Sequence, residues 1–210
     1  MQAQLFLISP GIDDPAAFRK ALEAALRAGS VASLLLRFTA RDGAADKAAR
    51  PLISLAQQHG AAALIEAGAD PRLAARSGAD GAHAAGEAFL EAALDSLKPE
   101  RIVGAGGLKS RHAAMEAAEA GVDYVMFGEP RADASLPDFA DVIERCEWWA
   151  EVFQTPCAGF APRLEDIAAI AETGVEFVVL GDAVWLDPRG PEAAVKQALA
   201  EIAGVRPKPR

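Results

Sequence analysis

Two polar residues close apolar runs of the sequence at places where side-chain chemistry is expected. Arg37 follows the run 31–36, and His83 closes the short run 81–83. A guanidinium at such a position is suited to an anion, although it could equally pair with a carboxylate of a neighbouring loop. His83 is either an acid-base group that works near neutral pH or a hydrogen-bonded residue of an interior layer.

A second group of candidates follows the runs 101–103 and 122–127. The first run leads into a glycine cluster at 104–107, followed by Lys109. Gly106 and Gly107 could cradle a phosphate or form a tight turn, because the spacing is not that of a P-loop. Glu129 joins His83 and Lys109 as a catalytic candidate, and Arg131 is a further anion contact.

Carboxylates gather near two other expected strand ends. Glu66 and Asp70 follow the run 61–65, and Glu87 follows His83. Carboxylate oxygens are the ligands that Mg²⁺ prefers, so Asp70 and Glu87 are candidate metal ligands. The alternative is that they are ordinary loop acids.

Residues 101–130 show which elements position these side chains. An apolar run ends in glycines, an alanine-rich segment follows Ser110, and Gly121 precedes a second apolar run. Ser110 is a suitable N-cap and Gly121 a suitable residue just past a helix C-terminus. Strand, helix and strand in about thirty residues form a βαβ unit, whose two strands are parallel.

The same alternation fills the chain. Apolar runs predict eight strands, at 4–8, 31–36, 61–65, 81–83, 101–103, 122–127, 156–159 and 177–180. Predicted helices lie between them, with Pro51 as a kink or late start. The candidates are a closed barrel and an open doubly wound sheet, and strands that are apolar throughout favour the barrel because it has no edges. We therefore predict one small (β/α)₈ TIM barrel over residues 1–204 and a basic, disordered tail at 205–210.

A barrel places function at the carboxyl ends of its strands. This adds Gly159, Ala161 and Gly181 to Arg37 as expected phosphate contacts. Near copies of one tetrapeptide recur, as AGAD at 67–70, SGAD at 77–80, AGVD at 120–123 and TGVE at 173–176, and three of them follow a predicted helix and lead into a predicted strand. Each glycine is expected just past a helix and each acid in the turn into a strand.

Composition excludes several partners. The chain has 210 residues and a formal net charge of −9, which argues against binding a nucleic-acid backbone. Its beginning resembles neither a secretory signal nor a membrane span, so we expect a cytoplasmic protein without a membrane partner. Cys146 and Cys157 are expected to be buried thiols. Tryptophans at 148, 149 and 185 are expected in helix packing or at the interface of a homo-oligomer.

The chain resembles the thiamine-phosphate synthase superfamily, which includes the thiazole tautomerases. The resemblance runs in order from LFLIS through LLLR, GADGAH and VGAGG to VDYVMFGEP and VVLGDAV. It implies a small (β/α)₈ barrel that handles phosphorylated thiazole. The synthases join a pyrimidine methyl diphosphate to thiazole phosphate, releasing magnesium-bound pyrophosphate.

Much of the family pattern is replaced. Its Gln-x-Arg-x-Lys leaves only Arg37, its Ser-Thr-His becomes 106–108, its Gly-Gly becomes Phe160-Ala161, and its Ser-Ala becomes Gly181-Asp182. Two hypotheses follow. The chain is a divergent transferase-type protein acting on a phosphorylated small heterocycle, or it is a catalytically degenerate barrel that binds or regulates.

Overall fold

The computed structural model describes residues 2–39, 43–67, 70–131, 133 and 135–206. Within them the strands pair in parallel, each with its neighbour in sequence, and the last with the first. The predicted barrel is confirmed. Its strands are β1 (Gln4–Ile12), β2 (Ser33–Phe38), β3 (Ala62–Ala67), β4 (Gly81–Ala85), β5 (Ile102–Gly106), β6 (Tyr124–Phe127), β7 (Cys157–Phe160) and β8 (Phe177–Leu180).

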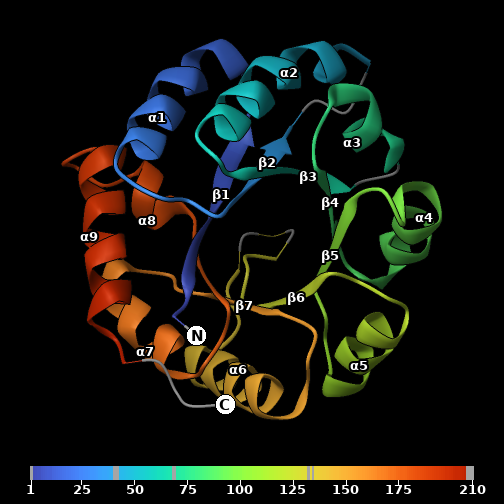
Figure 1. The fold of residues 1–210 in the computed structure, drawn as a ribbon, viewed down its shortest axis with the longest axis vertical. Helices are drawn as coiled ribbons and strands as arrows, with labels where there is room; N and C mark the ends of the chain where they lie inside the picture. The colour runs from blue at the N-terminus through green and yellow to red at the C-terminus, as the bar shows by residue number, and fades with distance from the viewer. Residues whose placement is uncertain (1, 40–42, 68–69, 132, 134, 207–210) are drawn as a thin grey trace.

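Helices surround the strands in chain order, as Figure 1 shows. Pro51 lies inside α2, and a 3₁₀ turn (Leu164–Asp166) precedes α7. The helices are α1 (Pro15–Arg27), α2 (Gly43–Gln58), α3 (Arg72–Ser77), α4 (Glu87–Leu97), α5 (Arg111–Glu119), α6 (Phe139–Val152), α7 (Ile167–Glu172), α8 (Asp182–Trp185) and α9 (Pro191–Gly204).

The apolar core has two parts. The larger cluster lies between strands and helices, and the smaller one fills the barrel itself. Alternate strand residues belong to different clusters, because successive side chains leave a strand on opposite faces. The residues inside the barrel are Phe6, Ile8, Leu35, Leu64, Tyr124, Met126, Ala158, Phe160 and Val179.

The first strand is longer than predicted. Residues 9–11 do not turn away from the barrel but form a bulge, since the pairing with β2 shifts between Ile8 and Gly11. Ser9 Oγ accepts a hydrogen bond from the backbone N–H of Arg37 at 2.9 Å. A hydroxyl thus keeps the two strands joined where the regular ladder is interrupted, and the bulge lies next to the barrel mouth.

The repeated glycine-acid turns hold the opposite, N-terminal end of the barrel. Gly78, Gly121 and Gly174 have φ of 84°, 94° and 96°, as predicted for residues just past a helix. Gly68, in the fourth copy, lies outside the described residues. The acids of these three turns accept backbone N–H groups at 2.7 Å: Asp80 from Ala63, Asp123 from Val103 and Glu176 from Cys157. Each acid therefore fastens the start of the preceding neighbour strand.

Two further boundaries differ from the prediction. β5 continues through Gly106, and only Gly107, with φ of 63°, makes the turn. The short helix α8 was not predicted. Trp185 anchors α8, because its indole N–H donates to the carbonyl of Ile8 at 2.6 Å. Trp149 is fully buried and stacks on Phe153, which confirms helix packing for this tryptophan.

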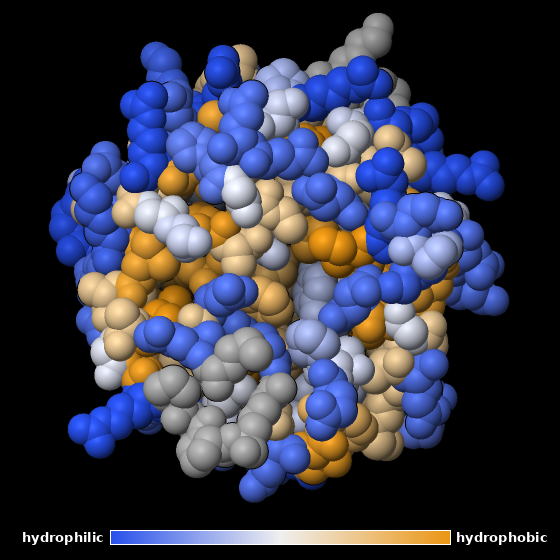
Figure 2. Space-filling model, in the orientation of Figure 1, coloured by the Kyte–Doolittle hydropathy of each residue, from blue (hydrophilic) through white to orange (hydrophobic). Residues whose placement is uncertain are grey.

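Hydrophilic residues cover most of the face drawn in Figure 2, with apolar residues showing in patches between them. Among the described residues, none of the helices combines the length and apolar character needed to cross a bilayer.

Candidate functional site

Five polar side chains meet inside the barrel, toward its mouth. Four lie near the carboxyl ends of strands, Arg37 on β2, Glu66 on β3, His83 on β4 and Glu129 in the loop after β6, and the fifth, Tyr124, is the first residue of β6 and reaches His83 with its hydroxyl. Glu66 and His83 are paired in the register of β3 and β4. The placement agrees with the general location of barrel active sites.

His83 and Tyr124 form the buried part of this cluster. His83 Nδ1 lies 2.8 Å from the Tyr124 hydroxyl, and the two rings are stacked with centroids 5.7 Å apart. Burial, and to a smaller extent the charge of Arg37, lowers the pKa of His83 to about 4. The imidazole is therefore neutral at pH 7. Its other nitrogen, Nε2, is buried and has no hydrogen-bond partner within the described residues.

The Glu129 carboxyl group is about half protonated near neutral pH. Its Oε1 accepts a hydrogen bond from the backbone N–H of Gly107. Burial raises the pKa of Glu129 to about 7, against the opposing effects of that N–H and of Arg37. A carboxyl group with this pKa can either accept or donate a proton at physiological pH.

The glycines of β5 make room for these side chains. A Cβ atom at Gly106 would stand 2.5 Å from His83 Nε2 and closer still to Glu129 Oε1. A Cβ atom at Gly104 would collide with the ring of Tyr124. These two glycines thus make room for neighbouring side chains, and the predicted phosphate contact at Gly106 stays a prediction. Only Gly107 is at the turn itself.

Arg37 shows one of the two relationships considered for it from sequence, the pairing with a carboxylate, and its contact with an anion stays a prediction. Its Nε lies 3.4 Å from Glu66 Oε1, and 31% of its side chain is exposed. The same charge acts on His83 and Glu129. Arg37 thus contributes a positive charge to a cluster that contains two carboxyl groups.

The other predicted cations lie outside this cluster. Lys109 is exposed, at the beginning of the segment that leads into α5. Arg131 is also exposed, and its guanidinium donates to Ser135 Oγ at 3.2 Å and to the Leu136 carbonyl at 3.4 Å. Arg131 is therefore held by its own loop.

The predicted phosphate contacts near the ends of β7 and β8 are Gly159, Ala161 and Gly181, and each lies in a different environment. Gly159 lies within β7, and a Cβ there would face outward to Ile170 and Cys146. The Ala161 N–H donates to the carbonyl of Val179 at 2.9 Å, so it belongs to the strand ladder. Gly181 precedes α8, with the Phe160 ring 3.3 Å from the position of its Cβ. The Phe160 side chain lies inside the barrel, close to Gly128 after β6 and to Gly181 after β8.

The two predicted metal ligands are apart from the cluster. Asp70 pairs with Arg76 at 2.9 Å and accepts the backbone N–H of Arg72 at 3.1 Å. Glu87 is exposed at the first turn of α4. Across the described part of the chain, no three His, Cys, Asp or Glu residues lie close enough to hold a metal ion together. Because Mg²⁺ often takes only one or two protein carboxylates together with substrate phosphates and waters, its binding here stays a prediction.

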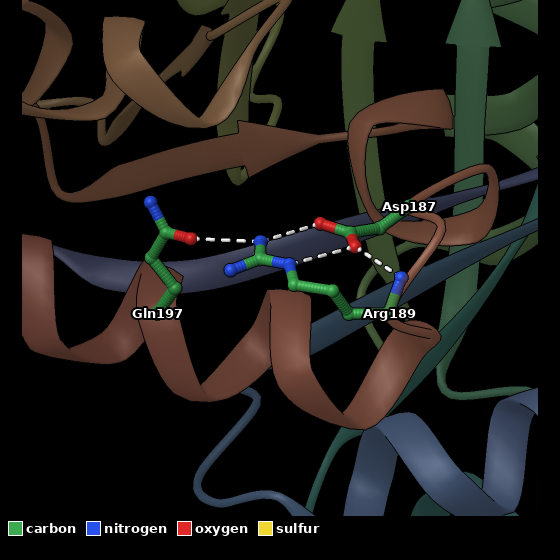
Figure 3. A network of polar contacts seen from close by, with 3 residues as sticks. All are labelled: Asp187, Arg189 and Gln197. Carbon is green, nitrogen blue, oxygen red and sulfur yellow. Dashed lines mark hydrogen bonds and ion pairs between the residues drawn. The ribbon is translucent and has the colours of Figure 1, made fainter.

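An open depression of about 430 Å³ lies beside the loops after β7 and β8. The two arginines of its lining are paired with neighbouring residues. Arg189 bonds to both Asp187 and Gln197 (Figure 3), and Arg163 bonds to Asp166 at 2.8 Å. Both arginines of the depression are thus already engaged.

Sequence reasoning found four of the five clustered residues and missed the fifth as a functional residue. Tyr124 is the only tyrosine of the chain, and it stands inside an otherwise apolar run. A phenol in a buried strand needs a hydrogen-bond partner, which is the signal that could have drawn attention to it. The partner itself, His83, is 41 residues away in sequence.

Comparisons with known proteins agree with this architecture. A thiamine-phosphate synthase from Hyphomonas neptunium is 35% identical over 93% of this chain and 91% of its own length. One from Rhodospirillum centenum is 38% identical over 91% of this chain and 94% of its own length. Among solved structures, thiamine phosphate pyrophosphorylase from Pyrococcus furiosus superposes with a TM-score of 0.76 at 19% identity, covering 95% of each chain.

The family described as thiamine monophosphate synthase matches residues 5–184. This match covers most of the barrel, including every residue of the mouth cluster. Together with the two relatives, it shows that the chain belongs to the thiamine monophosphate synthase family.

Proposed function

We propose that the chain acts in thiamine biosynthesis by binding a phosphorylated small heterocycle at the mouth of the barrel. The relatives named thiamine-phosphate synthase support the role in thiamine biosynthesis. The ligand would be of the thiazole phosphate or pyrimidine diphosphate class. Its anionic group would lie near Arg37 and the Gly107 N–H, and its ring would lie toward His83.

The strongest support for this proposal comes from His83 Nε2. His83 Nε2 is a buried polar atom without a partner among the described residues, in a cluster that also contains an arginine and a near-neutral carboxyl group. Leaving such an atom unpaired costs about 1–3 kcal/mol, so a partner supplied by a ligand or by a change of state would be stabilising.

A product assay tests the transferase function. Purified protein is given the pyrimidine diphosphate and thiazole phosphate at saturating magnesium, and thiamine phosphate is measured. A turnover of about 1 s⁻¹ lies within the usual range for enzymes. We expect a value far below it, because the metal ligands and hydroxyl donors of the family pattern are replaced. Turnover near that value would show that the residues of this mouth replace them effectively.

A second candidate is a barrel that binds such a ligand without turning it over. Phe160 favours it, because its ring occupies interior space between the loops after β6 and β8. Thermal melting with thiazole phosphate, with pyrimidine diphosphate and with pyrophosphate distinguishes the candidates, since a ligand of the native state raises the melting temperature. Stabilisation without product would support the binding protein, and no stabilisation by any of them would contradict both.

A further inference from the structure

The Glu129 carboxylate already accepts a hydrogen bond from the Gly107 N–H, the donor that we expect an anionic ligand to use. Gly107 directs its backbone N–H toward the mouth, and Glu129 Oε1 accepts it. A ligand that is to bind this N–H must first displace the carboxylate. Glu129 is thus an anion belonging to the protein at the place where we expect the anion of the ligand.

The charges around Glu129 make that displacement depend on a proton. Arg37 faces it from β2, Glu66 pairs with Arg37 from β3, His83 faces it from β4, and the Tyr124 hydroxyl stands below it on β6. With both carboxyl groups ionised and His83 neutral, the cluster holds one positive and two negative charges. A doubly charged anion added to this cluster would be repelled unless one carboxylate took up a proton.

His83 Nε2 offers the place to which a protonated Glu129 can turn. If His83 donates its Nδ1 proton to the Tyr124 oxygen, then Nε2 is an acceptor. Nε2 and Glu129 Oε1 border the same space above Gly106, where neither leaves room for a Cβ. A protonated carboxyl group there can donate its O–H to Nε2, which satisfies the buried nitrogen and releases the Gly107 N–H.

We propose that anion binding at the barrel mouth is coupled to the uptake of one proton by Glu129, whose carboxyl group moves from the Gly107 N–H to His83 Nε2. The proton comes from solvent, and the anion takes the released N–H beside Arg37. This inference rests on the proposed anion site, and it adds that the ligand binds as a dianion together with a proton.

Sulfate is the probe that separates this coupling from the titration of the ligand. Phosphate changes its own charge near pH 7, whereas sulfate remains a dianion from pH 6 to pH 8. Calorimetric titrations in two buffers of different ionisation enthalpy give the affinity and the protons taken up. We expect about one proton per sulfate at pH 8, fewer at pH 6, and an affinity that falls up to about tenfold per pH unit above pH 7.

Glu129→Gln supplies the decisive variant. An amide cannot take up the proton, and its NH₂ can donate to His83 Nε2, so the variant should bind sulfate with no pH dependence and no proton uptake. Glu91→Gln, at an exposed position of α4, is the matched control and should behave as the unmodified protein. Proton uptake that persists in Glu129→Gln, or binding by the unmodified protein that is independent of pH, would overturn the coupling.

Other outcomes of the sulfate titration, and an NMR measurement, also decide whether the coupling exists. Sulfate binding to neither protein would remove the anion site and with it the proposed ligand, whereas equal, pH-independent binding to both would remove only the coupling. If Glu129→Gln does not fold, carboxyl ¹³C NMR of the unmodified protein measures the midpoint of Glu129 directly. Sulfate should raise that midpoint, and an unchanged midpoint would refute the proposal.

Discussion

His83 Nδ1 and the Tyr124 hydroxyl are 2.8 Å apart inside the barrel, joining β4 to β6 across the glycines of β5. This bond crosses a strand that contributes no side chain at that level. The tyrosine thereby determines which nitrogen of the imidazole faces the mouth.

Tyr124→Phe should destabilise the protein by about 1–3 kcal/mol. The variant keeps the ring but leaves His83 Nδ1 buried without its partner, and such a loss costs the desolvation of the abandoned group. Urea unfolding measures the difference. An unchanged midpoint with an unchanged slope would show that His83 finds another partner.

Gly106→Ala should destabilise by about 1–3 kcal/mol, the usual range for overpacking. Its methyl group would occupy the space of His83 Nε2 and the Glu129 carboxyl group. Gly204→Ala is the control, because nothing lies within 4 Å of the position of its Cβ. Thermal unfolding of both variants should show a loss for the first only, and equal melting temperatures would contradict the crowding at Gly106.

Asp123→Ala should cost about 1–3 kcal/mol, since it removes the acceptor of the Val103 N–H and the partner of Lys98, both at 2.7 Å. Asp95→Ala, at an exposed position of α4, should change the free energy of unfolding by less than about 0.5 kcal/mol. Denaturant unfolding compares the pair. Similar small effects in both would mean that the acids of the αβ turns do not fasten the strands.

Glu129 and His83 should oppose each other in the pH dependence of stability. The pKa of Glu129 rises from 4.5 to about 7 on folding, so the folded state holds the extra proton and stability falls as pH rises through this interval. The pKa of His83 falls from 6.5 to about 4, so its contribution is complete above pH 6.5 and is lost as pH falls toward 4.

Between pH 4.5 and 6.5 the contributions of Glu129 and His83 to the free energy of unfolding change with pH in opposite directions and nearly cancel in the unmodified protein. Glu129→Gln removes one of them, so its free energy of unfolding should rise over this range by about 2–3 kcal/mol relative to the unmodified protein. Denaturant unfolding at half-unit pH steps measures the difference between the two proteins. A difference that does not change with pH would mean that Glu129 does not have its raised pKa.

The sequence by itself determined the order of elements and the turns between them. Gly78, Gly121 and Gly174 are recognisable because a left-handed residue past a helix is a local requirement, and the acid two positions later depends on the same turn. Eight apolar runs likewise predicted the barrel. The strand ends were not determined locally: residues 9–11 were predicted as a turn because Ser, Pro and Gly are common in turns, whereas pairing with β2 makes them a bulge.

Only the tertiary structure decided which residues form the site. The strands are apolar on both faces, so their sequence does not reveal that Gly104 and Gly106 face inward and Ala105 outward. That orientation is set by the register with the neighbouring strands, which brings Tyr124 and His83 together from 41 residues apart. The pKa of Glu129 follows from the same enclosure, because burial by distant segments, and not its neighbours in sequence, disfavours the charged carboxylate.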